Sequence, residues 1–137
     1  MHRFVSRALL VLVTAVAIGA CNNTPIVTTP TPGTPVTDTY SGTLSKNGAF
    51  THAFSISTLG SITASIVALS PNTSQIVGLQ LGVWNGVSCT AASSNDTATT
   101  GSSITLNASA AGVVCVRLYD VGFISDPVLY ELQVVHP

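Results

Sequence analysis

Apolar residues alternate with polar or small residues along most of the chain after residue 39. A period of two is the pattern of a β-strand, whose side chains point alternately to opposite faces of a sheet. Turn-forming Gly, Asn and Pro residues separate the alternating runs at strand-length spacing, which favours an antiparallel sandwich or barrel. We expect about eight strands, beginning near residues 39, 49, 61, 76, 87, 103, 112 and 128.

Two local expectations accompany this pattern. The dipeptide Asn85-Gly86 tolerates positive φ at both positions and favours a type I′ hairpin turn. The segment 91–103 is rich in Ser, Thr, Asn and Ala and shows neither period, so it is interpreted as a loop.

Few residues are charged. Charged residues make up 7% of the sequence, and the formal net charge is -1. A nucleic-acid-binding surface needs clustered basic residues, and coiled coils and charged disordered tails are rich in Glu and Lys residues. The composition therefore excludes these classes and leaves room for one small domain.

The chain begins with a targeting segment. His2, Arg3 and Arg7 form a short basic start, and residues 8–20 form an apolar run that is too short to span a bilayer. The run ends in Ile18-Gly19-Ala20-Cys21, which resembles the lipobox of bacterial lipoproteins. An ordinary signal peptide followed by a coincidental Cys is the alternative.

The lipobox resemblance implies that residues 1–20 are removed and that Cys21 becomes a lipidated first residue. A protein of this kind is exported and held at a membrane by acyl chains such as palmitate. Asn22 and Asn23 follow, and neither is the Asp that marks inner-membrane retention in this family. The resemblance thus favours the outer membrane, with the domain facing the periplasm or the cell surface.

Residues 21–38 form a linker between this anchor and the domain at 39–137. The linker is rich in Thr and contains four prolines, which prevent a helix or a central strand. An extended, polyproline-like linker of this length reaches roughly 50 Å. An ordered strand is plausible only at its end, near residues 36–40.

The domain resembles the bacterial pre-peptidase C-terminal domain. The resemblance rests on Tyr40-Ser-Gly-Thr-Leu44, on the alternation from Phe50 to Phe54, and on two later strand motifs at 112–120 and 130–134. It implies a jelly-roll-like β-sandwich with an accessory, non-catalytic character. Some members of that family bind calcium through acidic loops, and no dense acidic cluster matches here.

The residues offer little for catalysis or metal binding. After cleavage the histidines are His52, in the apolar phase of its strand, and His136, the penultimate residue, where a substitution is expected to change little. No nucleophile motif accompanies them, so we expect no catalytic residue, no cofactor and no metal site. Weak calcium candidates are Asp38, Asp120 and Asp126; the alternative for the last two is a solvated turn.

Three further residues matter. Cys89 and Cys115 remain once Cys21 is lipidated, and an even number of cysteines in an exported protein predicts a disulfide. The phase of Cys115 opposes that of Val114 and Val116, so this bridge is expected on the less buried face. Trp84 is a possible ligand contact, because exposed aromatics stack on sugars, although it could instead cover the glycines of its own sheet.

The sequence therefore predicts a non-enzymatic, lipid-anchored β-sandwich with a structural or binding role. Its partners would be the membrane, through Cys21, and an envelope protein or glycan. One alternative is a carbohydrate-binding or adhesin-like module that uses Trp84. A second is a small hydrolase, which would require His, Ser and Asp side chains that converge in a pocket.

Overall fold

The computed structural model describes residues 33–137. The predicted signal segment 1–20, the predicted lipidation residue Cys21 and most of the predicted linker lie outside these residues, in a part of the chain that is not described. No helix within 33–137 has the length and apolar character needed to cross a membrane.

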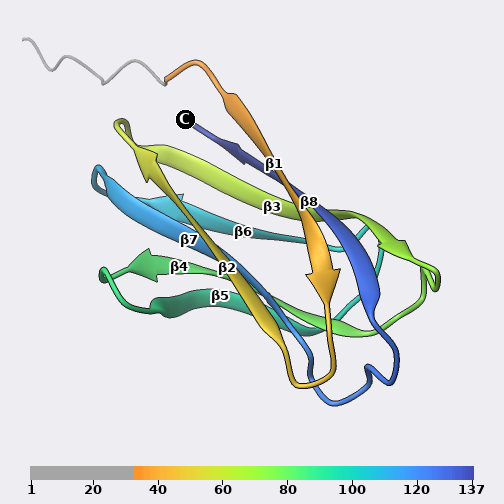
Figure 1. Ribbon diagram of the computed structural model, residues 1–137. Coiled ribbons are helices and arrows are strands. Elements are labelled where there is room, and N and C mark those ends of the chain that lie inside the picture. Colours follow the sequence, from red (N-terminus) through yellow and green to blue (C-terminus); the bar gives the residue numbers. More distant parts are fainter. Residues whose placement is uncertain (1–32) are drawn as a thin grey trace, which may run out of the picture.

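The domain is an antiparallel sandwich of eight strands, as the alternation predicted (Figure 1). One sheet has the order β1-β8-β3-β6 and the other the order β2-β7-β4-β5. This is the strand order of a jelly roll, in which each sheet contains strands from both the N-terminal and the C-terminal half of the domain. The strands are β1 (Val36–Leu44), β2 (Ala49–Ile56), β3 (Gly60–Ser70), β4 (Val77–Trp84), β5 (Cys89–Ala98), β6 (Ser103–Ala108), β7 (Gly112–Tyr119) and β8 (Val128–His136).

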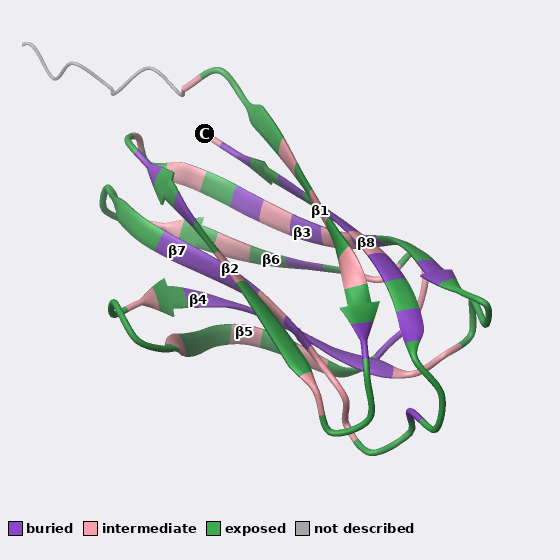
Figure 2. Cartoon of the chain, viewed as in Figure 1, coloured by how far each residue is buried: buried purple, intermediate pink, exposed green. Residues whose placement is uncertain are grey.

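The core lies between the two sheets and consists of the inward-facing residues of the alternating runs. Figure 2 shows the resulting alternation of buried and exposed positions along β3 and β8. Burying these aliphatic side chains is the main force that holds the sheets together. The fully enclosed members include Leu44, Ile62, Ile66, Leu79, Leu81, Val116, Leu118, Leu132 and Val134.

The expected loop at 91–103 is mostly a strand. Residues 89–98 form β5, which pairs with β4 at the edge of its sheet. An edge strand is paired on one side only and is largely exposed here, so Ser, Thr and Asn serve it well and leave no apolar alternation to detect. Only Ala98 of this strand belongs to the core.

Three smaller differences concern strand ends and register. β1 begins at Val36, inside the segment assigned to the linker. A β-bulge between Ile66 and Ala68 shifts the phase of β3, so that Leu69 is buried in place of Ala68. At the β4–β5 turn Gly86 has a φ of 96°, but Asn85 is not among the residues with positive φ, so the turn is not of type I′.

The strand directions give the sandwich two ends. β1 begins at one end, together with the β2–β3, β4–β5 and β6–β7 turns; we call this the tether end (Figure 1). The opposite end, here the far end, holds the β1–β2, β3–β4, β5–β6 and β7–β8 connections. The chain therefore enters the domain, through β1, at the tether end.

Candidate binding face around Trp84

The outer face of the sheet β2-β7-β4-β5 carries the candidate ligand residue Trp84. Two glycines of β4 make this face unusually close-packed. A side chain at Gly78 would collide with the ring of Tyr119, and one at Gly82 would collide with the carbonyl of Thr90. The glycines are thus covered by Tyr119 and by strand β5, and Trp84 is not needed to cover them, contrary to one of the two sequence interpretations.

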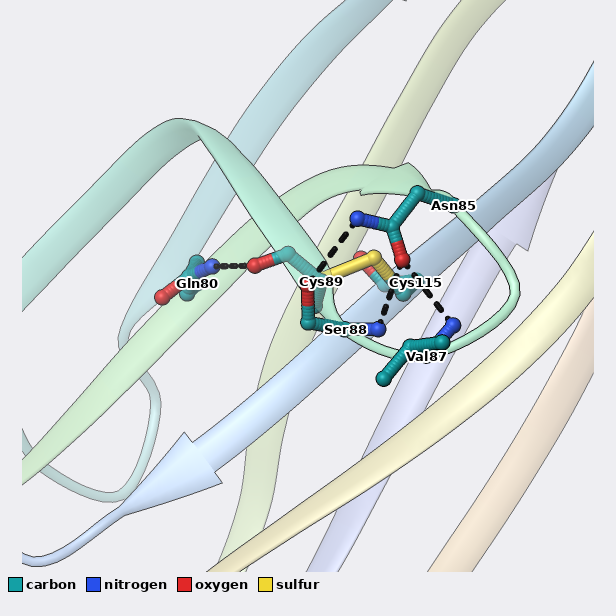
Figure 3. The surroundings of a disulfide bond; sticks show 6 residues. All are labelled: Gln80, Asn85, Val87, Ser88, Cys89 and Cys115. Atoms are coloured by element: carbon teal, nitrogen blue, oxygen red, sulfur yellow. Dashed lines mark hydrogen bonds between the residues drawn. A yellow bond between two sulfur atoms is a disulfide. The ribbon is translucent and has the colours of Figure 1, made fainter.

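The predicted disulfide lies on this outer face, with 5.8 Å between the Cα atoms of Cys89 and Cys115. It links β5 to β7 across β4, because Cys89 pairs with Trp84 and Cys115 pairs with Gly82 (Figure 3). Cys115 faces away from the core cluster, as its phase predicted, although its side chain is fully buried.

The turn beside the disulfide is held by Asn85. Its side-chain oxygen accepts hydrogen bonds from the backbone N–H groups of Val87 and Ser88, at 2.9 and 2.7 Å (Figure 3). The Gln80 side chain donates a further bond, of 3.0 Å, to the carbonyl of Cys89. The backbone at 85–89 is therefore fixed by side chains as well as by the disulfide.

A shallow hollow of about 360 Å³ opens on this face. An indole, a guanidinium and two hydroxyls are the groups within it that can contact a ligand. The lining residues are Thr51, Trp84, Val87, Ser88, Cys89 and Arg117. Trp84 is half-buried, so part of its indole remains open to a ligand.

Arg117 is a functional candidate that the sequence analysis missed. Its guanidinium lies 5.1 Å from the centre of the Tyr119 ring, a cation–π arrangement. Within residues 33–137 it forms no ion pair, since the one ion pair found there joins His136 and Asp38. The sequence could not predict that Arg117 lies near Trp84, because this placement depends on the pairing of β7 with β4.

Tyr119 connects this cation to a carboxylate. Its hydroxyl donates a hydrogen bond to Asp96 of β5. Burial and the neighbouring Asp96 carboxylate raise the pKa of Tyr119 to about 12, so the phenol stays protonated. Arg117, Tyr119 and Asp96 therefore form an ordered polar row beside the hollow.

His52 lies in the apolar phase of β2, as predicted, and has structural partners. Its ring stacks on Tyr40, with 4.3 Å between ring centres, and its Nε2 atom lies 3.1 Å from the Tyr130 hydroxyl. Burial lowers the pKa of His52. The contacts tie β1, β2 and β8 together at one side of the sandwich.

His136 is buried, which argues against the expectation that its substitution changes little. Its side chain is buried against Phe54, and its Nε2 atom lies 3.2 Å from the Asp38 carboxylate. Its Nδ1 atom faces the carbonyl oxygen of Pro137 at 3.3 Å. Both ring nitrogens thus face oxygen acceptors, an arrangement that leaves neither free to activate a Ser hydroxyl.

The three calcium candidates lie apart. Asp38 belongs to β1 near the tether end, whereas Asp120 and Asp126 lie in the β7–β8 loop at the far end. The Asp120 carboxylate accepts backbone hydrogen bonds from Asn47, Gly122, Phe123 and Ile124. Its oxygens therefore hold the loop, and residues 33–137 contain no cluster of three or more metal-ligating side chains.

Comparison with protein-family models and with curated proteins finds no match to this chain.

Proposed function

We propose that the chain is an exported lipoprotein whose β-sandwich has a structural or binding role and no enzymatic activity. The observation that carries the proposal is Ile18-Gly19-Ala20-Cys21 behind a basic start and a short apolar run. The positions of His52 and His136 support the absence of enzymatic activity, since both rings pack against neighbouring side chains of the described domain. The resemblance to the pre-peptidase C-terminal domain supports an accessory role.

The anchor is proposed for the outer membrane. Neither Asn22 nor Asn23 is acidic, so the inner-membrane retention signal described above is missing from the sequence. The chain from Cys21 onward has two basic and five acidic residues, a net charge of −3, and no basic patch that would attract anionic lipid. Membrane attachment must then come from the acyl chains, of which two or three are needed for firm anchoring.

Palmitate labelling of the full chain in a bacterial host tests this proposal. We expect the wild type to take up label and to sediment with membranes, and Cys21→Ser to lose both properties. The matched control is the double variant Cys89→Ala/Cys115→Ala, which keeps Cys21 and should still be labelled. Equal labelling of wild type and Cys21→Ser would contradict the proposal.

A glycan-binding role is the second candidate, and the hollow beside Trp84 is the observation that favours it. An indole can stack on a sugar ring while Arg117, Thr51 and Ser88 bind its oxygens. Titration with soluble envelope polysaccharides should then quench Trp84 emission, and Arg117→Ala should weaken binding. Unchanged emission would remove this candidate.

A further inference from the structure

Charge is distributed unequally between the two ends of the sandwich. The tether-end turns at 57–59, 85–88 and 109–111 contain no charged residue. The far end carries Lys46 in the β1–β2 turn and Asp120 and Asp126 in the β7–β8 loop. Two charged side chains outside these turns also approach the tether end: Asp38, whose carboxylate faces the buried His136 ring, and Arg117, in the hollow beside Trp84. Charged groups lose hydration when they approach hydrocarbon, so the uncharged tether-end turns could approach a lipid surface at lower cost than the charged β1–β2 and β7–β8 connections.

The tether end also exposes apolar side chains. Val87, at the tip of the β4–β5 turn, is 87% exposed, and Val83 and Leu59 are 56% and 44% exposed. Beside them a groove of about 400 Å³ runs between β4 and the β6–β7 turn. Mostly apolar residues line it, among them Ile56, Trp84, Leu106, Ala108, Ala110 and Val113. Exposed apolar side chains together with an apolar groove at one end of a domain are typical of an interaction surface.

The linker joins the domain at this same end. Cys21 precedes the first residue of β1, Val36, by 15 positions. An extended linker of that length reaches roughly 45 Å, so a lipid on Cys21 keeps the tether end within reach of the bilayer at high effective concentration. For the far end to make the same contact, the domain would have to invert, and the linker would have to run back along the length of the sandwich.

We propose that the tether end docks on the lipid bilayer, with Trp84 at the membrane interface. Tryptophan favours this region because its ring is apolar and its N–H is polar. Val87 and Leu59 would enter the headgroup layer, while the charged far end projects away from the membrane. This inference rests on the proposed lipid anchor at Cys21.

The single tryptophan of the sequence provides the probe. Lipidated full-length protein is reconstituted in vesicles of phosphatidylethanolamine and phosphatidylglycerol, with and without brominated acyl chains. We expect bromine to quench about half or more of the Trp84 emission, because an interfacial indole lies close to the acyl chains. Absence of quenching would overturn the docking proposal.

A matched control moves the probe to the other end. In Trp84→Phe/Phe123→Trp, the only tryptophan lies in the β7–β8 loop, at a position that is 63% exposed. We expect no quenching in this variant, and equal quenching of both proteins would overturn the proposal. A second variant, Val87→Asp, places a charge at the tip of the docking surface and should reduce quenching of Trp84 while the disulfide still forms.

Lipidation of the same samples separates this inference from the proposed function. Labelled Cys21 with unquenched Trp84 means that the anchor exists and the docking is wrong. An unlabelled chain overturns both. A change in Trp84 emission caused by soluble polysaccharide, with none caused by vesicles, assigns the surface to a glycan and overturns docking.

Discussion

The two ends of the sandwich are stabilised by different means. At the tether end a covalent bridge between Cys89 and Cys115 joins β5 to β7, and the neutral Asn85 fixes the adjoining turn. At the far end the charged Asp120 carboxylate accepts hydrogen bonds from backbone N–H groups of the β1–β2 turn and the β7–β8 loop. The tether end thus achieves order without any charge in its turns, which is the property that a surface facing lipid requires.

The largest expected effect is the loss of the disulfide. In Cys89→Ala/Cys115→Ala, the unfolded chain regains the freedom of a segment closed at a separation of 26 residues. The chain-entropy relation gives a loss of about 3.5 kcal/mol in the free energy of unfolding. Urea denaturation at neutral pH measures it. Cys21→Ser serves as the control and should leave the midpoint unchanged; a loss below about 1 kcal/mol in the double variant would contradict this account of the tether end.

The corresponding change at the far end is Asp120→Ala. It removes the acceptor of four backbone hydrogen bonds, and we expect a loss of about 1–2 kcal/mol at pH 7, because the acceptor is charged but close to solvent. Asp126→Ala, which removes one side-chain contact with Ser125, is the matched control and should cost less. Equal losses of unfolding free energy in the two variants would show that the backbone hydrogen bonds of Asp120 do not stabilise the far end.

The same residue predicts a dependence on pH. Burial acts to raise the pKa of Asp120, but its backbone hydrogen bonds prevail and lower it below the usual value of 3.8. A lowered pKa means that the carboxylate stabilises the fold above that unfolded value and stops doing so as the pH falls through the folded pKa. The difference between wild type and Asp120→Ala should therefore shrink in acid. A difference that grows below pH 4 would have the wrong sign.

His52 gives a smaller effect. Burial lowers the pKa of His52, so the unfolded chain binds a proton more readily, and its contribution to stability falls as the pH drops below the unfolded value of about 6.5. Between pH 7.5 and pH 5, wild type should lose a little more stability than His52→Phe, which cannot be protonated. Thermal unfolding at the two pH values gives the comparison. A larger loss of stability in His52→Phe than in wild type would mean that the folded protein favours the protonated His52 ring.

The smallest expected effect on stability is that of Val87→Asp. Val87 is almost fully exposed, so the free energy of unfolding should change by less than about 0.5 kcal/mol. Chemical denaturation of the soluble Cys21→Ser background measures this value. A larger loss would mean that Val87 supports the turn, and reduced docking of its variant would then have a structural cause.

The sequence predicted those elements whose signal is local. Strands such as β8 bury every second residue, so alternation reveals them, and the disulfide was predicted from the cysteine count and the proposed export. A strand beginning near residue 87 was predicted, but most of β5, residues 91–98, was predicted as a loop because an exposed edge strand needs no apolar face. The burial of His136 depends on a carboxylate 98 positions earlier in the chain, and the place of Arg117 depends on strand order. Neither of these long-range contacts produces a periodic pattern in the sequence.

Hydrogen exchange read by mass spectrometry tests the orientation of the two ends most directly. The lipidated chain in vesicles is compared with the soluble Cys21→Ser chain at the same pH. The account predicts slower exchange at the tether-end turns 85–88 and 109–111, and unchanged exchange at 45–48 and 120–127 of the far end. Equal exchange in both samples at the tether end, or protection of the far end instead, would contradict it.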